Sequence, residues 1–286
     1  MLIEQIINGI SLGSLYVLFA LGLTIVYSVL KLPWFAYAVI LVYGGYFTYS
    51  FCFMFNLNFW YGMIIGIILC ILISVILERL VVRFLYNIPH FQTFVAIFGI
   101  YMCMQYISLA IWGASAKPVP SFTNIILTIG SIRVPLKIIV IATVGIITIS
   151  LLHLLLKKTK FGKAIRAVSQ NYETAGTLGI NIHRVRTGVF FISGLLAGVS
   201  GAFFGTVHTI NPFIADFVIM KTFVVIVLGG ISSIRGCLIS GYFVGILESL
   251  IAAYVSSDFR DAILFGIIIL IMFIRPSGFI KIEGRE

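Results

Sequence analysis

The chain has 286 residues, of which 61% are hydrophobic and only 10% are charged, and its mean hydropathy is +1.16. A soluble domain averages about 25% charged residues and covers its surface with polar groups. This composition therefore excludes a water-soluble domain or enzyme and predicts a chain surrounded by membrane lipid. The net charge of +10 does not indicate nucleic-acid binding, because the basic residues lie between apolar segments, where membrane insertion places them.

Nine apolar runs follow one another along the chain. A spanning helix needs about 20 apolar residues, and the runs lack the alternation of a membrane β-barrel. We therefore expect one all-α domain over 1–286, a polytopic transmembrane helix bundle of about 8 to 10 spans. The last four runs are short or rich in glycine, so one span is expected to be broken or re-entrant. The runs cover residues 6–30, 35–56, 59–85, 93–112, 137–156, 187–207, 213–230, 237–253 and 262–275.

Glycines recur four residues apart inside these runs. Such spacing lets two helix backbones approach closely in a membrane, where no hydrophobic force drives helices together. We therefore expect tight helix crossings, within the chain or with a partner subunit. The pairs are Gly9/Gly13, Gly62/Gly66, Gly194/Gly198, Gly201/Gly205 and Gly241/Gly245.

Four polar residues inside the runs are candidates to line a transport pathway: Asn8, Tyr16, Tyr43 and Glu248. An ionisable residue inside a membrane is costly and indicates a function or a buried partner. For Glu248 both interpretations are open, an ion pair inside the bundle or a pathway-lining group. For the two tyrosines and Asn8, packing in the core is the competing interpretation.

Two further charged residues have sequence neighbours that suggest simple roles. Glu78 lies close to Arg79 and Arg83 near a helix end, so we expect it to extend toward the interface. Lys221 begins a run near Asp216, and we expect a local ion pair between them at the outer surface.

The loop 157–186 carries seven basic residues against one acid, Glu173. The positive-inside rule places this loop in the cytoplasm. By alternation, residues 113–136 and the N-terminus lie outside, and the C-terminal tail with Arg275, Lys281 and Arg285 lies in the cytoplasm.

The same loop has apolar residues at helical spacing, which predicts a short amphipathic helix. Gly179 is a plausible end for this helix. The helix could rest on anionic lipid, or it could couple the bundle to a cytoplasmic motor subunit; the spacing favours neither. The apolar positions are Ala164, Ile165, Val168, Ala175 and Leu178.

Sequence motifs for catalysis, nucleotide binding or metal binding are missing. The only Gly-Lys, at Gly162-Lys163, is followed by Ala164 and lacks the first glycine of a phosphate-binding loop. The sequence contains no metalloprotease or nucleophile-elbow motif, and its four histidines are dispersed. We expect a chain that is not an enzyme and that binds no cofactor or metal.

Four regions, spread over nearly the whole chain, resemble the permease subunits of branched-chain amino acid ABC importers, specifically the H-type permease of the high-affinity leucine, isoleucine and valine system. Two stretches depart from the family pattern: Trp34-Phe35-Ala36-Tyr37-Ala38 lacks its usual Asn, His and Gly, and Asn171 stands where Asp is usual. The matching regions are Ile7-Asn8-Gly9-Ile10-Ser11-Leu12-Gly13-Ser14-Leu15-Tyr16 with Ala20-Leu21-Gly22-Leu23-Thr24-Ile25-Val26-Tyr27; Gly162-Lys163-Ala164-Ile165-Arg166-Ala167 through Leu178-Gly179-Ile180-Asn181; Lys221-Thr222-Phe223-Val224-Val225-Ile226-Val227-Leu228-Gly229-Gly230 with Ser233-Ile234 and Gly236; and Leu247-Glu248-Ser249 with Arg275-Pro276-Ser277-Gly278.

The resemblance implies a transport permease of the bacterial inner membrane that imports branched-chain amino acids or related small amino acids and amides. It implies a second homologous permease subunit, a periplasmic substrate-binding protein and two cytoplasmic ATPase subunits, which bind the ATP. The rival hypothesis is a self-sufficient secondary transporter or channel, for which the chain offers mainly Glu248 as an ion site. The ATPase-coupling residues that the resemblance implies are Gly162, Ala164, Ile165, Ala167, Val168, Ala175, Leu178 and Gly179.

Overall fold

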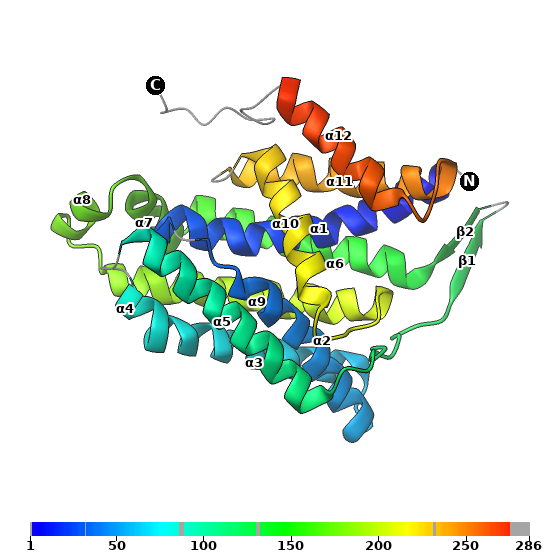
Figure 1. Ribbon diagram of the computed structural model, residues 1–286, viewed down its shortest axis with the longest axis horizontal. Coiled ribbons are helices and arrows are strands. Elements are labelled where there is room, and N and C mark those ends of the chain that lie inside the picture. Colours follow the sequence, from blue (N-terminus) through cyan, green and yellow to red (C-terminus); the bar gives the residue numbers. More distant parts are fainter. Residues whose placement is uncertain (1, 32, 86–88, 130–131, 231–232, 275–286) are drawn as a thin grey trace.

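The computed structural model describes residues 2–31, 33–85, 89–129, 132–230 and 233–274, and it is almost entirely helical (Figure 1). The elements are α1 (Leu2–Leu30), α2 (Ala36–Met54), α3 (Phe59–Leu77), the π-helical turn η1 (Glu78–Val82), α4 (Arg83–Leu85), α5 (His90–Trp112), β1 (Ile126–Ile129), β2 (Ile132–Pro135), α6 (Leu136–Lys158), α7 (Lys160–Gln170), α8 (Tyr172–Thr177), α9 (Ile182–Val207), α10 (Ile214–Gly229), α11 (Ile234–Tyr254) and α12 (Arg260–Ile274).

Each of the nine apolar runs forms a helix, which confirms the predicted all-α polytopic bundle. Within the described ranges, seven helical segments are long and apolar enough to cross a membrane. Of the other two, α10 has 16 residues and reaches only about 24 Å, less than the ~30 Å hydrocarbon core. Helix α12 is described over 15 residues, up to Ile274. In Figure 1, α10 also crosses the long axis of the bundle steeply. The expectation of a broken or re-entrant span applies best to α10 and stays a prediction.

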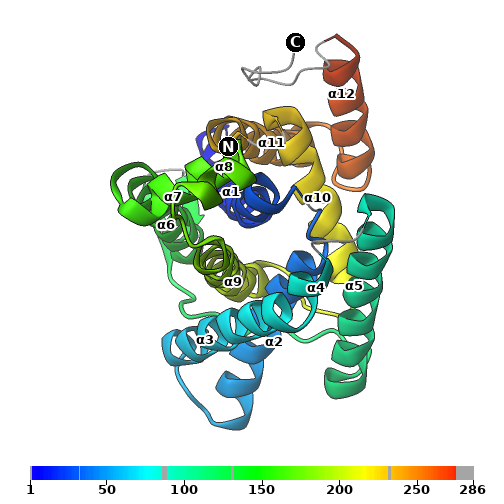
Figure 2. The same cartoon turned by 90° about the vertical axis from the view of Figure 1, so that its left-hand side faces the viewer.

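Helix α1 is the centre of the bundle. It is surrounded by α11, α10, α6, α9 and α2 when the bundle is viewed along its long axis (Figure 2). In its most apolar stretch 89% of the residues are buried, against 22% for the segments Phe59–Leu85 and Leu136–Lys158. These outer segments therefore present apolar side chains to lipid, as a membrane bundle requires.

The glycine pairs of α1 and α11 allow the closest packing at this centre. A Cβ atom on Gly9 would lie 2.6 Å from the Cα of Ile246, and one on Gly13 would lie 2.9 Å from the Cα of Tyr242. Gly241 and Gly245 face α1 in the same way. The predicted tight crossings are confirmed, and they lie within the chain. The remaining pairs pack α9 and α3 against their neighbours: Gly194, Gly198, Gly201, Gly205, Gly62 and Gly66.

The two polar regions that the sequence places on opposite sides of the membrane lie at opposite ends of the bundle. The hairpin β1–β2 stands beside the start of α1, where the Arg133 amide donates a 2.7 Å hydrogen bond to Glu4 Oε1. Helices α7 and α8 lie at the other end (Figure 1). Which end is cytoplasmic stays a prediction, and the C-terminal tail with its basic residues lies outside the described residues.

Candidate functional site

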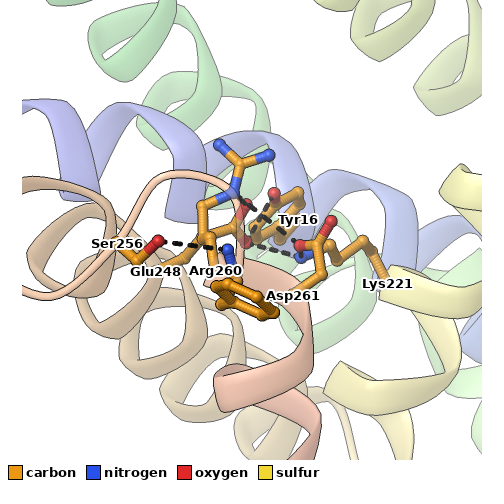
Figure 3. A network of polar contacts seen from close by, with 7 residues as sticks. Tyr16, Lys221, Glu248, Ser256, Arg260 and Asp261 are labelled. Atoms are coloured by element: carbon orange, nitrogen blue, oxygen red, sulfur yellow. Dashed lines mark hydrogen bonds and ion pairs between the residues drawn. The ribbon is translucent and has the colours of Figure 1, made fainter.

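Three helices bring charged side chains together inside the bundle, and a tyrosine from α1 joins them (Figure 3). Lys221 Nζ, from the middle of α10, lies 2.9 Å from Glu248 Oε2 on α11 and 2.6 Å from Asp261 Oδ1 on α12. Arg260 Nε lies 3.2 Å from Glu248 Oε1, which makes an ion pair but not a hydrogen bond. The Tyr16 hydroxyl of α1 donates a 2.8 Å hydrogen bond to Glu248 Oε2.

This charge network contains two positive and two negative groups, so it is neutral as a whole. The side chains of Glu248 and Lys221 are each 1% exposed, whereas Arg260 is 29% and Asp261 44% exposed. A buried charge is costly unless a partner neutralises it. Figure 3 shows how Lys221 is surrounded by its acceptors, and its ammonium also lies 5.2 Å from the centroid of the Phe217 ring. The interpretation of Glu248 as a member of a buried ion pair is confirmed.

The predicted ion pair between Lys221 and Asp216 is wrong. The two residues lie five positions apart, about 140° around a helix, so they point to different neighbours. Asp216 accepts a hydrogen bond from the Tyr101 hydroxyl and two at 3.4 Å from Gln105 Nε2, both on α5.

The expectation for Glu78 is wrong for a similar reason. Glu78 begins the π-helical turn η1, and its carboxylate faces α9 rather than Arg79 or Arg83. Glu78 is 2% exposed. Its Oε1 lies 2.6 Å from Arg186 Nε on α9, and its Oε2 accepts a 2.9 Å hydrogen bond from the Thr187 hydroxyl.

The four candidate pathway residues do not form one site. Tyr16 and Glu248 are in contact, but the Tyr43 hydroxyl donates a 2.7 Å hydrogen bond to the Met104 carbonyl and ties α2 to α5. Asn8 is half-buried, eight residues before Tyr16 on α1 and about 12 Å along the axis. A pathway-lining role for any of the four stays a prediction.

His208 connects the network to the loop that follows α9. Its ring stacks on Phe204 with centroids 4.7 Å apart. Burial lowers the pKa of His208, and Arg260 and Lys221 lower it further, while Glu248 and Asp261 act in the opposite direction.

The loop 157–186 contains two helices rather than the one expected. Asn171 has extended backbone angles (φ −150°, ψ 113°), and its Oδ1 accepts a 3.0 Å hydrogen bond from the Thr174 amide. It therefore caps α8 and separates it from α7. The predicted stop is confirmed, since α8 ends at Thr177 and Gly179 follows with φ 81°.

The eight predicted coupling residues divide by exposure. Ile165 and Val168 form a buried stripe of α7, which packs against α6, α1 and α9. Gly162 is buried where a Cβ would meet the carbonyls that end α6. These residues, with Ala175, are covered by the chain itself and are not free to contact a partner. Ala164 and Ala167 are half-buried, and Leu178 and Gly179 are exposed.

Sequence comparison shows the same family over almost the whole chain. The family model for the permease component of branched-chain amino acid transport systems matches residues 5–272. The chain is 30% identical to the high-affinity branched-chain amino acid transport system permease protein LivH of Escherichia coli, covering 96% of this chain and 94% of that protein.

Two more distant relatives cover the chain equally well. The probable branched-chain amino acid transport permease protein LivH of Methanocaldococcus jannaschii is 29% identical over 99% of this chain and 94% of its own. For the permease protein BraD of Pseudomonas aeruginosa the identity is 26%, over 96% and 94%. No solved structure matches the chain. The chain forms a multi-pass helical bundle, and the family model matches residues 5–272. The chain therefore belongs to the permease component family of branched-chain amino acid transport systems.

Proposed function

We propose that this chain is the membrane-spanning permease subunit of an ATP-driven importer of branched-chain amino acids. The observation that carries the proposal is the family match over residues 5–272. It is supported by relatives in Escherichia coli and Methanocaldococcus jannaschii whose names specify branched-chain amino acid transport. The chain would lie in the bacterial inner membrane with its N-terminus in the periplasm and its C-terminus in the cytoplasm.

Transport would require four kinds of protein. A periplasmic binding protein delivers the amino acid, this chain and a second homologous permease form the path, and two cytoplasmic ATPase subunits bind and hydrolyse ATP. The sequence offers no phosphate-binding loop of its own, which supports placing ATP on the partners.

The helices α7 and α8 would transmit the movement of the ATPases to the bundle. The apolar side of α7 packs on α6, α1 and α9, so a displacement of α7 moves the ends of three helices. The exposed end of α8 provides the contact, because Leu178 is 75% exposed and an apolar side chain in that position suits a pocket on a partner. Coupling of this kind is an equilibrium between two states that a distant ligand biases.

The charge network argues against a self-sufficient secondary transporter. Such a protein needs a membrane carboxylate that is free to bind an ion or proton. Among the described side chains, the fully buried carboxylates Glu78 and Glu248 each have a cationic partner within 3 Å. The exposed carboxylate of Asp216 on α10 accepts hydrogen bonds from Tyr101 and Gln105 instead.

Reconstitution tests the proposal directly. The purified chain alone in vesicles without ATP should take up no labelled leucine, whereas the complex of both permeases, both ATPases and the binding protein should concentrate it when ATP is supplied. Leucine uptake by the isolated chain, or uptake by the complex that does not depend on ATP, would contradict the proposal. The complex with an ATPase variant that binds but does not hydrolyse ATP is the matched control.

A further inference from the structure

A pocket of about 650 Å³ lies between the turn η1 and the first turns of α9. It is at the same end of the bundle as α7 and α8 (Figure 1). Four arginines line it: Arg79 and Arg83 from one side, and Arg184 and Arg186 from the other. The volume is within the range of small-molecule sites, about 300–1,000 Å³.

Three of these arginines are not paired with an acid among the described side chains. Glu78 is the one acid in the lining, and it is bound to Arg186. Arg79, Arg83 and Arg184 are exposed, and no ion pair joins them to an acid among the described side chains. The guanidinium group presents a planar set of donors that fits phosphate oxygens. The pocket is therefore built for a phosphate or a similar anion.

The surface that leads to the pocket is apolar. Ile68, Leu72 and Ile76 follow one another at four-residue spacing on α3, and each is about half exposed, at 51%, 49% and 50%. The stripe continues three and seven residues later into Arg79 and Arg83, so one face of the segment changes from apolar to basic. Phe191, 47% exposed, extends the apolar side at the pocket itself.

We propose that this pocket binds the phosphate of an anionic phospholipid, with the acyl chains lying along the stripe of α3. A free phosphate ion would use the arginines but gain nothing from the apolar stripe, whereas a phospholipid uses both. Basic pockets between membrane helices at the cytoplasmic side are suited to anionic headgroups. Arginines that only set topology have no reason to converge on one pocket with an apolar approach.

The test is the binding of headgroup-labelled phosphatidylglycerol to the full-length chain in detergent, relative to phosphatidylcholine. The triple variant Arg79→Gln/Arg83→Gln/Arg184→Gln leaves the Glu78–Arg186 pair intact and changes only exposed side chains. Each arginine near a membrane surface contributes about fivefold, so the preference for phosphatidylglycerol should fall roughly a hundredfold. Replacing the same three arginines with lysine should restore only part of it, because the charge returns without the planar donors of the guanidinium group.

The matched control removes the same charge outside the pocket, at three exposed lysines on the same end: Lys157→Gln/Lys158→Gln/Lys160→Gln. This variant should keep the lipid preference within about fivefold of the original chain. Equal losses in both triple variants would overturn the proposal in favour of diffuse surface attraction. Displacement of the lipid by millimolar inorganic phosphate would overturn it in favour of a free-anion site. If the triple arginine variant keeps its lipid preference but the assembled complex no longer captures the ATPases, the pocket is a protein-docking surface and the proposal is overturned.

Discussion

The pair of Lys221 and Glu248 gives the sharpest test of the buried charge network. Replacing Glu248 with Gln keeps the size of the side chain and an acceptor for the Tyr16 hydroxyl, so the change is mainly one of charge. Lys221 and Arg260 then face Asp261 alone, and an uncompensated positive charge remains inside the bundle. Breaking a buried pair by removing one partner costs about 3–5 kcal/mol. Because Lys221 keeps Asp261 at 2.6 Å, we expect the lower figure, about 3 kcal/mol.

The reverse substitution and the double variant complete the cycle. Lys221→Met should cost about the same, because it leaves Glu248 and Asp261 with Arg260 as their only cationic partner in the network. The double variant Glu248→Gln/Lys221→Met leaves the network neutral again, and we expect it to lie within about 1 kcal/mol of the original chain, since no uncompensated charge remains when both partners of a buried pair are replaced. The control Asp258→Asn, at an exposed site, should change stability by less than about 0.5 kcal/mol.

The assay is unfolding by sodium dodecyl sulfate in mixed micelles, followed by tryptophan fluorescence. The free energy of unfolding of the double variant must exceed that of either single variant. If the losses of the two single variants simply add in the double variant, the charges do not interact as the structure indicates. If either single variant stays within about 1 kcal/mol of the original chain, the network is not closed to water.

Three further results are expected. Gly245→Leu should destabilise the α1–α11 crossing by about 1–3 kcal/mol or prevent folding, because the added atoms meet the backbone of Gly13. The control Gly99→Leu should fold normally, because a Cβ at that position meets nothing within 4 Å. Equal stability of the two variants in sodium dodecyl sulfate unfolding would contradict the close packing. Leu178→Glu should weaken ATPase capture in co-purification while the purified chain keeps its unfolding midpoint, and unchanged capture would remove α8 from the interface. The pKa of His208 is lowered in the folded chain, so the unfolded chain binds the proton first: stability should be constant above about pH 6.5 and fall as pH drops toward the lowered pKa. In the variant His208→Gln the unfolding midpoint should no longer fall as the pH drops. If its pH profile equals that of the original chain, His208 is not the group responsible.

The sequence was sufficient to predict the bundle because apolar runs of spanning length have one stable form in lipid. The glycine spacing predicts that some helices cross closely. It could not name the partner helix, because Gly13 and Gly245 are far apart in the chain and only the fold brings them together. The same limit applies to Tyr16 and Glu248, which are separated by 232 positions.

The predicted ion pair of Lys221 is wrong because residues that are close in the sequence need not be close in space. Lys221 has no neighbour of opposite charge three or four residues away, the spacing that shares a helix face. That absence, in an apolar run, was the available signal for a distant partner. Arg260 and Asp261 flank the next-but-one run and could have been considered as candidates.

The break between α7 and α8 has a signal in the sequence. Asn171 is a favoured N-cap residue, and the amide it accepts from, at Thr174, lies three positions on, the usual capping distance. Asp has the same preference, so the replacement of the family's usual Asp by Asn171 keeps the cap. The departure therefore leaves the local structure of the predicted coupling segment intact.

The charge network and the predicted coupling segment are connected by α1. Its middle carries Tyr16, bound to Glu248, and its far end packs on α7. The network itself divides into two neutral pairs, a buried one of Glu248 with Lys221 and a half-exposed one of Arg260 with Asp261 on α12. Helix α12 can therefore separate from α10 and α11 without leaving an unpaired charge in the membrane. A network arranged this way stabilises the packed state and still permits α12 to move, as the proposed transport function would require.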